Sequence, residues 1–446
     1  MFRNFKFSKY LLNNGWLPFI CTIHAKYSEK IDYRVQKEVP DEIKIFRATK
    51  FDIVTSLSIW MKWSKKQFAK IVSPKKEKNQ GRLDSDLGHV PAPRLSIIKR
   101  LSNFIKYLLW FPDRYSGWIF PGFIYAFFVV KRNKIDVLYS SSPPASTLII
   151  GLLLKKCTKL PWVVDYRDPW TNDYKGTFNT RFLKKIHQII EKAVLRNADA
   201  IIFNTEGMRD IYQENYGHKF DKKLSVIMNG VDVQDFENFQ ELVFAKKETA
   251  ALNMIHTGEF FNPGRLPDSL LQAIGELVLA EEISKNGLQV SFVGGAEYKQ
   301  WTNYNSLFAK YPLIDVIDFT EHVSHREVIQ NLAGADLLLL LQTDSMFSNQ
   351  IPAKVFEYIL SGKPILAIIT EGVTKNLLEQ LIPDQRNLWI VPPVVPKIKE
   401  CLLEIVHNKS QGDLLCQERE QGVVGQISRK NLTKKLASLL DDISSR

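Results

Sequence analysis

The chain has 446 residues, of which 45% are hydrophobic and 24% are charged. This composition excludes a disordered or fibrous protein, and the length is sufficient for two domains with separate cores. The 60 basic residues exceed the 48 acidic ones and give a net charge of +12. The charge indicates an anionic partner but does not choose among nucleic acid, anionic lipid and a phosphorylated substrate.

The cysteines and the apolar runs exclude further classes. The four cysteines are isolated in the sequence, which predicts a reducing compartment and neither disulfides nor a zinc site. No apolar run reaches the roughly 18 to 20 residues that span a bilayer. The longest, Trp118 to Val130, is shorter and contains Pro121 and Gly122.

The first predicted element is a basic amphipathic helix from Met1 to Leu12. It ends at Asn13-Asn14-Gly15 and precedes a strand from Trp16 to His24. Residues 26–95 show weak periodicity, and residues 73–83 have the composition of a charged loop.

Basic and aromatic residues are interleaved around residues 60–70 and again from Ile97 to Trp110. One interpretation is a pair of helices that lie on an anionic membrane surface. The other is a set of helices whose aromatic residues enter the core while the lysines stay in solvent. The sequence leaves both open.

Strands and helices alternate regularly after Asp136. The expected elements of this half are strand 137–139, helix 148–154, strand 162–165, helix 180–197, strand 200–203 and strand 225–227. A second run of the same kind has strands at 254–258, 290–293, 316–319, 336–341 and 365–367. Such alternation predicts an α/β fold with parallel sheets covered by helices on both faces. We also expect a last helix from Arg429 to Ile443, and we expect His187 and His218 to lie on the surface.

The segment from Ile351 to Ala367 contains the most informative pattern. Lys354 and Glu357 are three positions apart, so a helix places both on one face, where they can reach one ligand. The opposite face, predicted to enter the core, carries Val355, Phe356, Ile359 and Leu360. The pattern Gly362-Lys-Pro-Ile-Leu then predicts a turn and a short strand.

This segment resembles the donor-binding helix of GT-B glycosyltransferases, in particular the retaining family 4 and relatives that build bacterial surface polysaccharides. The resemblance implies that Glu357 accepts hydrogen bonds from the ribose of a nucleotide-sugar and that Lys354 lies near the diphosphate. A carboxylate suits two hydroxyl donors, and a diphosphate suits cations and free helix N–H groups.

Two motifs of the first half match a family 4-like subgroup. Asp165-Tyr-Arg-Asp-Pro-Trp170 follows a predicted strand, and Ser140-Ser-Ser-Pro-Pro precedes it. Open parallel sheets bind ligands at the carboxyl ends of their strands. The resemblance implies that Asp168 orients or deprotonates the acceptor hydroxyl, and that Arg167 binds phosphate or holds Asp168. An internal Arg167–Asp168 bridge is the structural alternative.

Four further positions can be compared with the family. Asn229-Gly-Val-Asp232 resembles the turn that contributes backbone to the donor site, and Gly258 follows the first strand of the second half, where glycine permits close approach of a diphosphate. Arg265 stands near the place of a family lysine. Asn349 occupies the place of the first of the family's two glutamates, which leaves the transferred sugar undefined.

The resemblance implies a GT-B fold, with two Rossmann-like domains facing across a cleft. We expect residues 1–240 to form the acceptor-side domain, residues 241–425 the nucleotide-sugar domain, and residues 426–446 a helix that crosses back. The family's first strand and glycine-rich loop do not precede the first helix. Either the sequence begins late, or the protein lacks this strand and is inactive.

The expected function is transfer of a sugar from a nucleotide-sugar to a glycan or lipid-linked acceptor, with retention, in polysaccharide biosynthesis of the cell envelope. We expect no metal or other cofactor, because no D-x-D motif stands at the end of a predicted strand and no acid or histidine cluster has the spacing of metal ligands. We expect a cytoplasmic protein at the inner face of the plasma membrane, with peripheral contact to anionic lipid and no nucleic-acid partner. Two alternatives are a non-catalytic nucleotide-sugar-binding remnant and a GT-B nucleotide-sugar 2-epimerase.

Overall fold

A computed structural model describes residues 2–27, 38–51, 111–171, 181–244, 249–261 and 264–445. The predicted charged loop at 73–83 and the two basic and aromatic segments lie outside the described residues. Contacts divide the chain into two compact units. Unit 1 consists of Met1–Trp16, Asn172–Thr177 and Ala200–Arg446, and unit 2 consists of Leu17–Thr171 and Phe178–Asp199. The predicted domains of residues 1–240, 241–425 and 426–446 are grouped differently and stay a prediction.

Unit 2 contains two pairs of parallel strands. They are β1 (Phe19–Ile23) with β2 (Lys44–Ala48), and β3 (Leu138–Ser142) with β4 (Trp162–Tyr166). All five residues of β4 are buried, as expected for a parallel strand covered on both faces. Within the described ranges, the helices of this unit are α5 (Ile119–Arg132), α6 (Ser146–Thr158) and α7 (Arg181–Asn197). Helix α6 packs against β3 and against the other two helices.

The expectation that His187 lies on the surface is wrong. His187 belongs to the buried face of α7, and Trp170 Nε1 donates a hydrogen bond of 2.9 Å to its Nδ1. Burial lowers the pKa of His187 to about 4, so the ring is a neutral acceptor. His218, in contrast, is exposed as expected.

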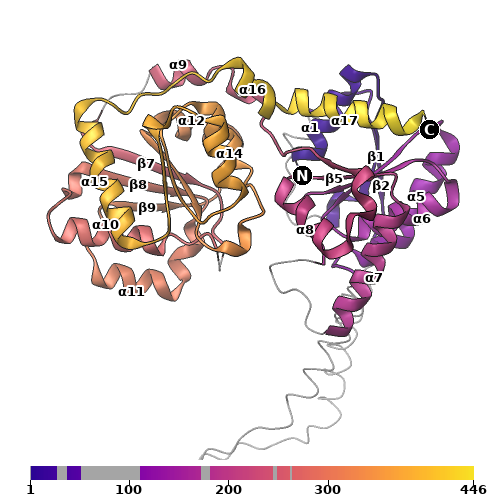
Figure 1. Ribbon diagram of the computed structural model, residues 1–446, viewed down its shortest axis with the longest axis horizontal. Helices are drawn as coiled ribbons and strands as arrows, with labels where there is room; N and C mark the ends of the chain where they lie inside the picture. Colours follow the sequence, from indigo (N-terminus) through magenta and orange to yellow (C-terminus); the bar gives the residue numbers. More distant parts are fainter. Residues whose placement is uncertain are drawn as a thin grey trace, which may run out of the picture. The chain divides into compact units, whose positions relative to one another are not determined.

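The six-stranded sheet of unit 1 is entirely parallel, with the order β12-β11-β10-β7-β8-β9. Figure 1 labels three of its strands, β7, β8 and β9. Its strands are β7 (Leu252–Thr257), β8 (Leu288–Val293), β9 (Ile317–Thr320), β10 (Leu337–Gln342), β11 (Ile365–Ile369) and β12 (Leu388–Val391). The sequence predicted five of these six strands, and β12 was not expected.

Helices cover both faces of this sheet. In β10, Leu337, Leu339 and Leu341 enter one core, while Leu338 and Leu340 enter the other, because successive side chains of a strand point to opposite faces. The first core is closed by α10 (Asp268–Leu279), α11 (Thr302–Lys310) and α15 (Val395–Gln411). The second is closed by α12 (His325–Gly334), α13 (Lys354–Ser361) and α14 (Val373–Leu381).

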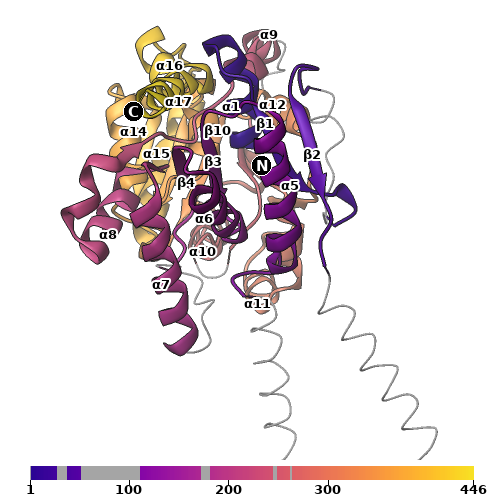
Figure 2. The same cartoon turned by 90° about the vertical axis from the view of Figure 1, so that its right-hand side faces the viewer.

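Unit 1 also contains both terminal helices. Helix α1 (Phe2–Leu11) packs against α17 (Arg429–Ser444), as Figure 2 shows. The parallel pair β5 (Ala200–Phe203) and β6 (Leu224–Val226), helix α8 (Glu206–Tyr216), helix α9 (Phe239–Phe244) and helix α16 (Gln421–Ile427) complete the unit. The predicted helices at both ends of the chain are therefore present.

Candidate functional site

Helix α13 presents Lys354 and Glu357 as the sequence predicts. The helix begins at Lys354, and Glu357 lies in its first turn. The buried face carries Val355, Phe356, Tyr358, Ile359 and Ser361. It agrees with the predicted core face except that Tyr358 and Ser361 are added and Leu360 is only half-buried. Since the Tyr358 hydroxyl donates to the Leu339 carbonyl at 3.2 Å, the helix is tied to β10.

Gly362 ends helix α13 in a conformation that favours glycine. Its φ is +70°, and a Cβ at this position would lie 1.8 Å from the Gln417 carbonyl oxygen. A side chain there would therefore meet backbone, so the turn between α13 and β11 requires glycine.

Lys354 is held by a residue of β7 that the sequence analysis did not single out. Its Nζ lies 2.9 Å from Nε2 of His256, and the Nδ1 of His256 lies 3.0 Å from the Leu339 carbonyl oxygen. A carbonyl oxygen only accepts, so Nδ1 carries the proton and Nε2 accepts from Lys354. The tautomer of His256 is thus set by the backbone of β10.

Gly258 leaves room for the Lys354 ammonium group. Its φ is +103°, and a Cβ would lie 3.2 Å from Lys354 Nζ. The Gly258 N–H donates to the Val293 carbonyl at 2.7 Å, which fixes the end of β7 beside β8. No side chain therefore stands between this backbone and the lysine nitrogen, at the point where the resemblance places a diphosphate.

The second expected cation, Arg265, lies in the same electrostatic environment. Its guanidinium is 5.2 Å from the ring centroid of Phe261 and 5.3 Å from that of Phe347. Burial, and then the charge of Arg265, lower the pKa of Lys354 to about 7, although Glu357 opposes this change. The basic side chains of Lys354 and Arg265 therefore act on one another beside Gly258, and a bound anion there would interact favourably with both.

Glu357 is also half-buried, with a side chain that is 19% exposed. Burial raises its pKa, and the positive charge of His325 opposes this effect. Nδ1 of His325 lies 3.9 Å from Oε1 of Glu357, and its Nε2 lies 3.2 Å from Oδ2 of Asp235. The hydrogen bond with Asp235 raises the pKa of His325, which favours an imidazolium between two carboxylates.

The charged network extends from Asp235 to helix α1. Lys6 Nζ lies 2.7 Å from Oδ2 of Asp232 and 3.5 Å from Oδ1 of Asp235, and the Tyr10 hydroxyl donates to Asp232 at 2.6 Å. The Lys6 and Asp232 side chains are only 6% and 2% exposed. Arg429 of α17 interacts electrostatically with Glu357 and with both aspartates.

Asn229 belongs to a turn that the terminal helices hold. The Asn229 carbonyl accepts from Nε of Arg429 at 3.2 Å, and the Met228 carbonyl accepts from Nη1 of Arg3 at 2.6 Å. The same Arg3 nitrogen lies 3.5 Å from Oδ1 of Asn229. The structure thus brings Asn229 into contact with the arginines that border the charged network, and its donor-binding role stays a prediction.

Asn349 makes a different connection. Its carbonyl accepts from the Thr205 hydroxyl at 2.7 Å, and Thr205 caps helix α8. Its side-chain oxygen would lie 2.5 Å from a Cβ at Gly207. Asn349 therefore connects the loop before α13 to the start of α8 by a hydrogen bond. Its contact with a donor stays a prediction.

Asp168 and Arg167 follow β4 in unit 2. The backbone N–H of Arg167 donates to the Ser142 carbonyl at 2.9 Å, and its Nη2 donates to the Pro143 carbonyl at 3.0 Å. Asp165, before them, is fully buried and accepts from the Tyr139 hydroxyl at 2.6 Å. Arg167 therefore connects the two predicted motifs to each other. The catalytic roles of Asp168 and Arg167 stay predictions.

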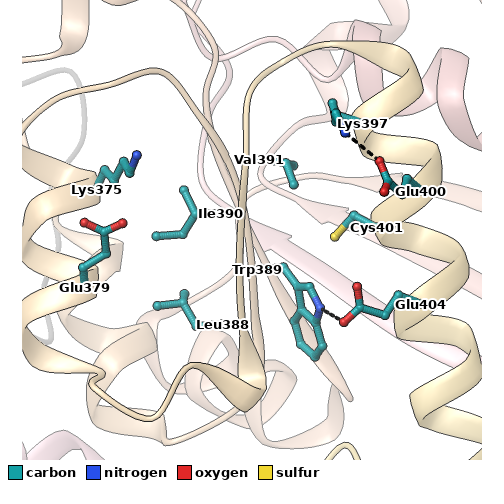
Figure 3. A pocket seen from close by; sticks show the side chains of 10 residues that line it. All are labelled: Lys375, Glu379, Leu388, Trp389, Ile390, Val391, Lys397, Glu400, Cys401 and Glu404. Atoms are coloured by element: carbon teal, nitrogen blue, oxygen red, sulfur yellow. Dashed lines mark hydrogen bonds and ion pairs between the residues drawn. The ribbon is translucent and has the colours of Figure 1, made fainter.

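A hollow of about 370 Å³ lies elsewhere, along β12 between α14 and α15 (Figure 3). Two pairs of its lining residues contact each other: Lys397 contacts Glu400 at 2.8 Å, and Trp389 Nε1 donates to Glu404 at 2.9 Å. None of the predicted site residues lines it. We therefore place the candidate site at the amino end of α13.

Two observations concern the described residues only. No helix among them is both long enough and apolar enough to cross a membrane. No group of three or more histidine, cysteine, aspartate or glutamate side chains in these ranges is arranged to hold a metal ion.

Comparison with known proteins gives the fold class. Residues 87–235 match the family described as Glycosyltransferase Family 4. Sucrose-phosphate synthase from Thermosynechococcus elongatus is 13% identical, with a TM-score of 0.60 over 99% of this chain and 92% of that one. A glycosyltransferase from Rickettsia africae is also 13% identical, with a TM-score of 0.58 over 99% and 94%. The chain has a GT-B fold.

A third similar structure is the N-terminal domain of trehalose-6-phosphate phosphatase from Candida albicans. It is 10% identical, with a TM-score of 0.53 over 96% of this chain and 89% of that one. A search of curated protein sequences found no match. The expected GT-B fold is confirmed, and at these identities the similarity concerns the fold alone.

Proposed function

We propose that this GT-B protein is a glycosyltransferase that transfers a sugar from a nucleotide-sugar to a glycan or lipid-linked acceptor, with retention of configuration. Its place would be the biosynthesis of a cell-envelope polysaccharide, in the cytoplasm at the inner face of the plasma membrane. The observation that carries the proposal is the pair Lys354 and Glu357 at the start of α13, beside the open backbone at Gly258.

Each group of the site has a part in donor binding. The Glu357 carboxylate would accept hydrogen bonds from the two ribose hydroxyls. The diphosphate would lie beside Lys354, Arg265 and Gly258, where cations and the amino end of α13 offset its charge. Asn229 and Asn349 would complete the donor site.

The same cations serve the reaction. When the glycosidic bond to the diphosphate breaks, negative charge develops on the leaving phosphate oxygen. Lys354 and Arg265 would stabilise that charge without a metal ion. In unit 2, Asp168 would orient or deprotonate the acceptor hydroxyl, and Arg167 would bind phosphate or hold Asp168.

The test measures consumption of nucleotide-sugars by the purified protein, with and without a lipid-linked acceptor. Transfer to the acceptor supports the proposal. Interconversion of the sugar without acceptor indicates the epimerase instead, and donor binding without turnover indicates the non-catalytic alternative.

A pair of glutamate variants locates the site. Glu357→Ala removes two charge-assisted hydrogen bonds to ribose and is expected to weaken donor binding at least roughly ten-fold. Glu379→Ala changes a glutamate of the neighbouring helix α14 and serves as the matched control. Equal donor affinity of Glu357→Ala and the control would contradict the proposed site.

A further inference from the structure

The contact between His256 and Lys354 depends on a buried histidine ring that is held in one protonation state. His256 is completely buried in β7. Its ring stacks on Phe260 at a centroid distance of 5.4 Å, and the ring of Phe292 lies 6.0 Å away. This aromatic environment and the nearby lysine lower the pKa of His256 well below its ordinary value. The ring is therefore a neutral acceptor with one tautomer.

In the part of the chain that the structure describes, Lys354 has one hydrogen-bond partner, and its nitrogen lies beside the backbone of Gly258. His256 Nε2 accepts from its Nζ at 2.9 Å, while Gly258 has no side chain to cover that nitrogen. The other charged groups that act on Lys354 are Arg265, after β7, and Glu357, on its own helix. Arg265 disfavours the charged form of Lys354, and Glu357 favours it.

We infer that His256 is a positioning residue for Lys354: it holds the lysine nitrogen beside Gly258, and a diphosphate that binds there draws a proton onto that nitrogen from solvent. In this step the neutral amine of Lys354 takes one proton from solvent and becomes an ammonium ion in contact with the bound anion. The inference rests on the proposed function for the identity of that anion.

The charge state of Lys354 supports this coupling. Its pKa is lowered to about 7, so the lysine of the free protein is largely neutral at pH 8. A diphosphate within contact distance favours the charged form and raises this pKa again. Donor binding at pH 8 should therefore take up close to one proton, and binding at pH 6 much less.

Titration calorimetry in two buffers of different ionisation enthalpy measures the number of protons taken up. The probes are UDP-glucose, GDP-mannose and dTDP-glucose, because a diphosphate esterified at both ends does not titrate between pH 6 and 8. The probe that binds most tightly is used for the variants. Lys354→Arg should bind it without proton uptake at pH 8, since arginine is always charged.

Two variants of His256 test its role. His256→Phe keeps the ring stacking but removes the acceptor, and it should weaken binding roughly ten-fold. His256→Gln can offer an amide oxygen to Lys354 and should stay within about three-fold of the unmodified protein. A purely structural histidine would lower the melting temperature of both variants and would leave the two affinities alike.

The results separate the inference from the proposed function. If a probe binds without proton uptake at pH 8, or with the same affinity to His256→Phe, the inference is overturned and the proposed function stands. If His256→Phe does not fold, the number of protons taken up at pH 8 tests the inference: close to one for the unmodified protein and none for Lys354→Arg supports it, and equal numbers overturn it. If no probe binds and no nucleotide-sugar is consumed, the proposed function fails and the inference fails with it.

Discussion

His325, on helix α12, faces Glu357, on helix α13, with 3.9 Å between Nδ1 and Oε1. The other ring nitrogen of His325 is 3.2 Å from Asp235. The histidine thus connects an aspartate that contacts helix α1 to the carboxylate expected to bind ribose. This relation would make the proposed donor site sensitive to groups that do not touch the donor.

Asp235→Asn should weaken donor binding by roughly three- to ten-fold at pH 7. The substitution removes the carboxylate that accepts the hydrogen bond of His325 and raises its pKa, so an imidazolium beside Glu357 becomes less favoured. Calorimetry with a nucleotide-sugar measures the change. Asp210→Asn, at the surface pair with Arg209, is the control and should bind normally. Normal binding by both variants would show that His325 does not support Glu357.

Donor affinity should pass through a maximum as pH is varied. On the acid side, Glu357 becomes protonated at a higher pH than an ordinary glutamate, because burial raises its pKa. On the alkaline side, affinity should decline above about pH 7, where the free protein must gain a proton on Lys354 before it binds the diphosphate tightly. Dissociation constants from pH 5 to 9 measure both limbs. A flat alkaline limb would mean that Lys354 remains charged in the free protein.

Lys354→Met should stabilise the protein more at pH 6.5 than at pH 9. The pKa of Lys354 is lowered from 10.5 to about 7 on folding, so between these values the unfolded chain binds more protons than the folded one. Stability therefore rises with pH across this range, and the variant lacks this rise. The melting temperatures of the variant and the unmodified protein are measured at both pH values. The increase caused by the substitution should be larger at pH 6.5 than at pH 9 by a few degrees. An equal difference at both would contradict the lowered pKa.

Gly362→Ala should destabilise the fold by at least about 2 kcal/mol, because a Cβ would collide with the Gln417 carbonyl and the backbone is left-handed. Gly334→Ala, at the end of α12, meets nothing within 4 Å and should change stability by no more than about 1 kcal/mol. Chemical denaturation of the whole protein, followed by tryptophan fluorescence, gives the free energy of unfolding of both variants. Equal effects would mean that the turn after α13 adapts to a side chain.

The sequence predicted the elements that local patterns define. Lys354 and Glu357 are one turn apart, so a helical period was enough to place them together. Strand β12 was missed although Leu388–Val391 is an apolar run followed by Pro392 and Pro393, which is a recognisable strand signal.

The partners of these residues could not be predicted in the same way. His256 is separated from Lys354 by 98 positions, and only the register of β7 beside β10 brings them together. The positions of Asp235 and His325 likewise depend on the tertiary fold. His187 is different, because its spacing from Leu183, Glu191 and Val194 already follows the buried face of a helix.

The contacts of Lys6 and Arg429 have a consequence for biosynthesis. Lys6 pairs with the aspartates of the charged network, and Arg429 acts on Glu357 from the opposite end of the sequence. The ribosome must therefore have released the segment through residue 429 before this electrostatic environment can form. A nascent chain that stops short of α17 would carry α13 complete and still lack one of the cations that tune its carboxylate.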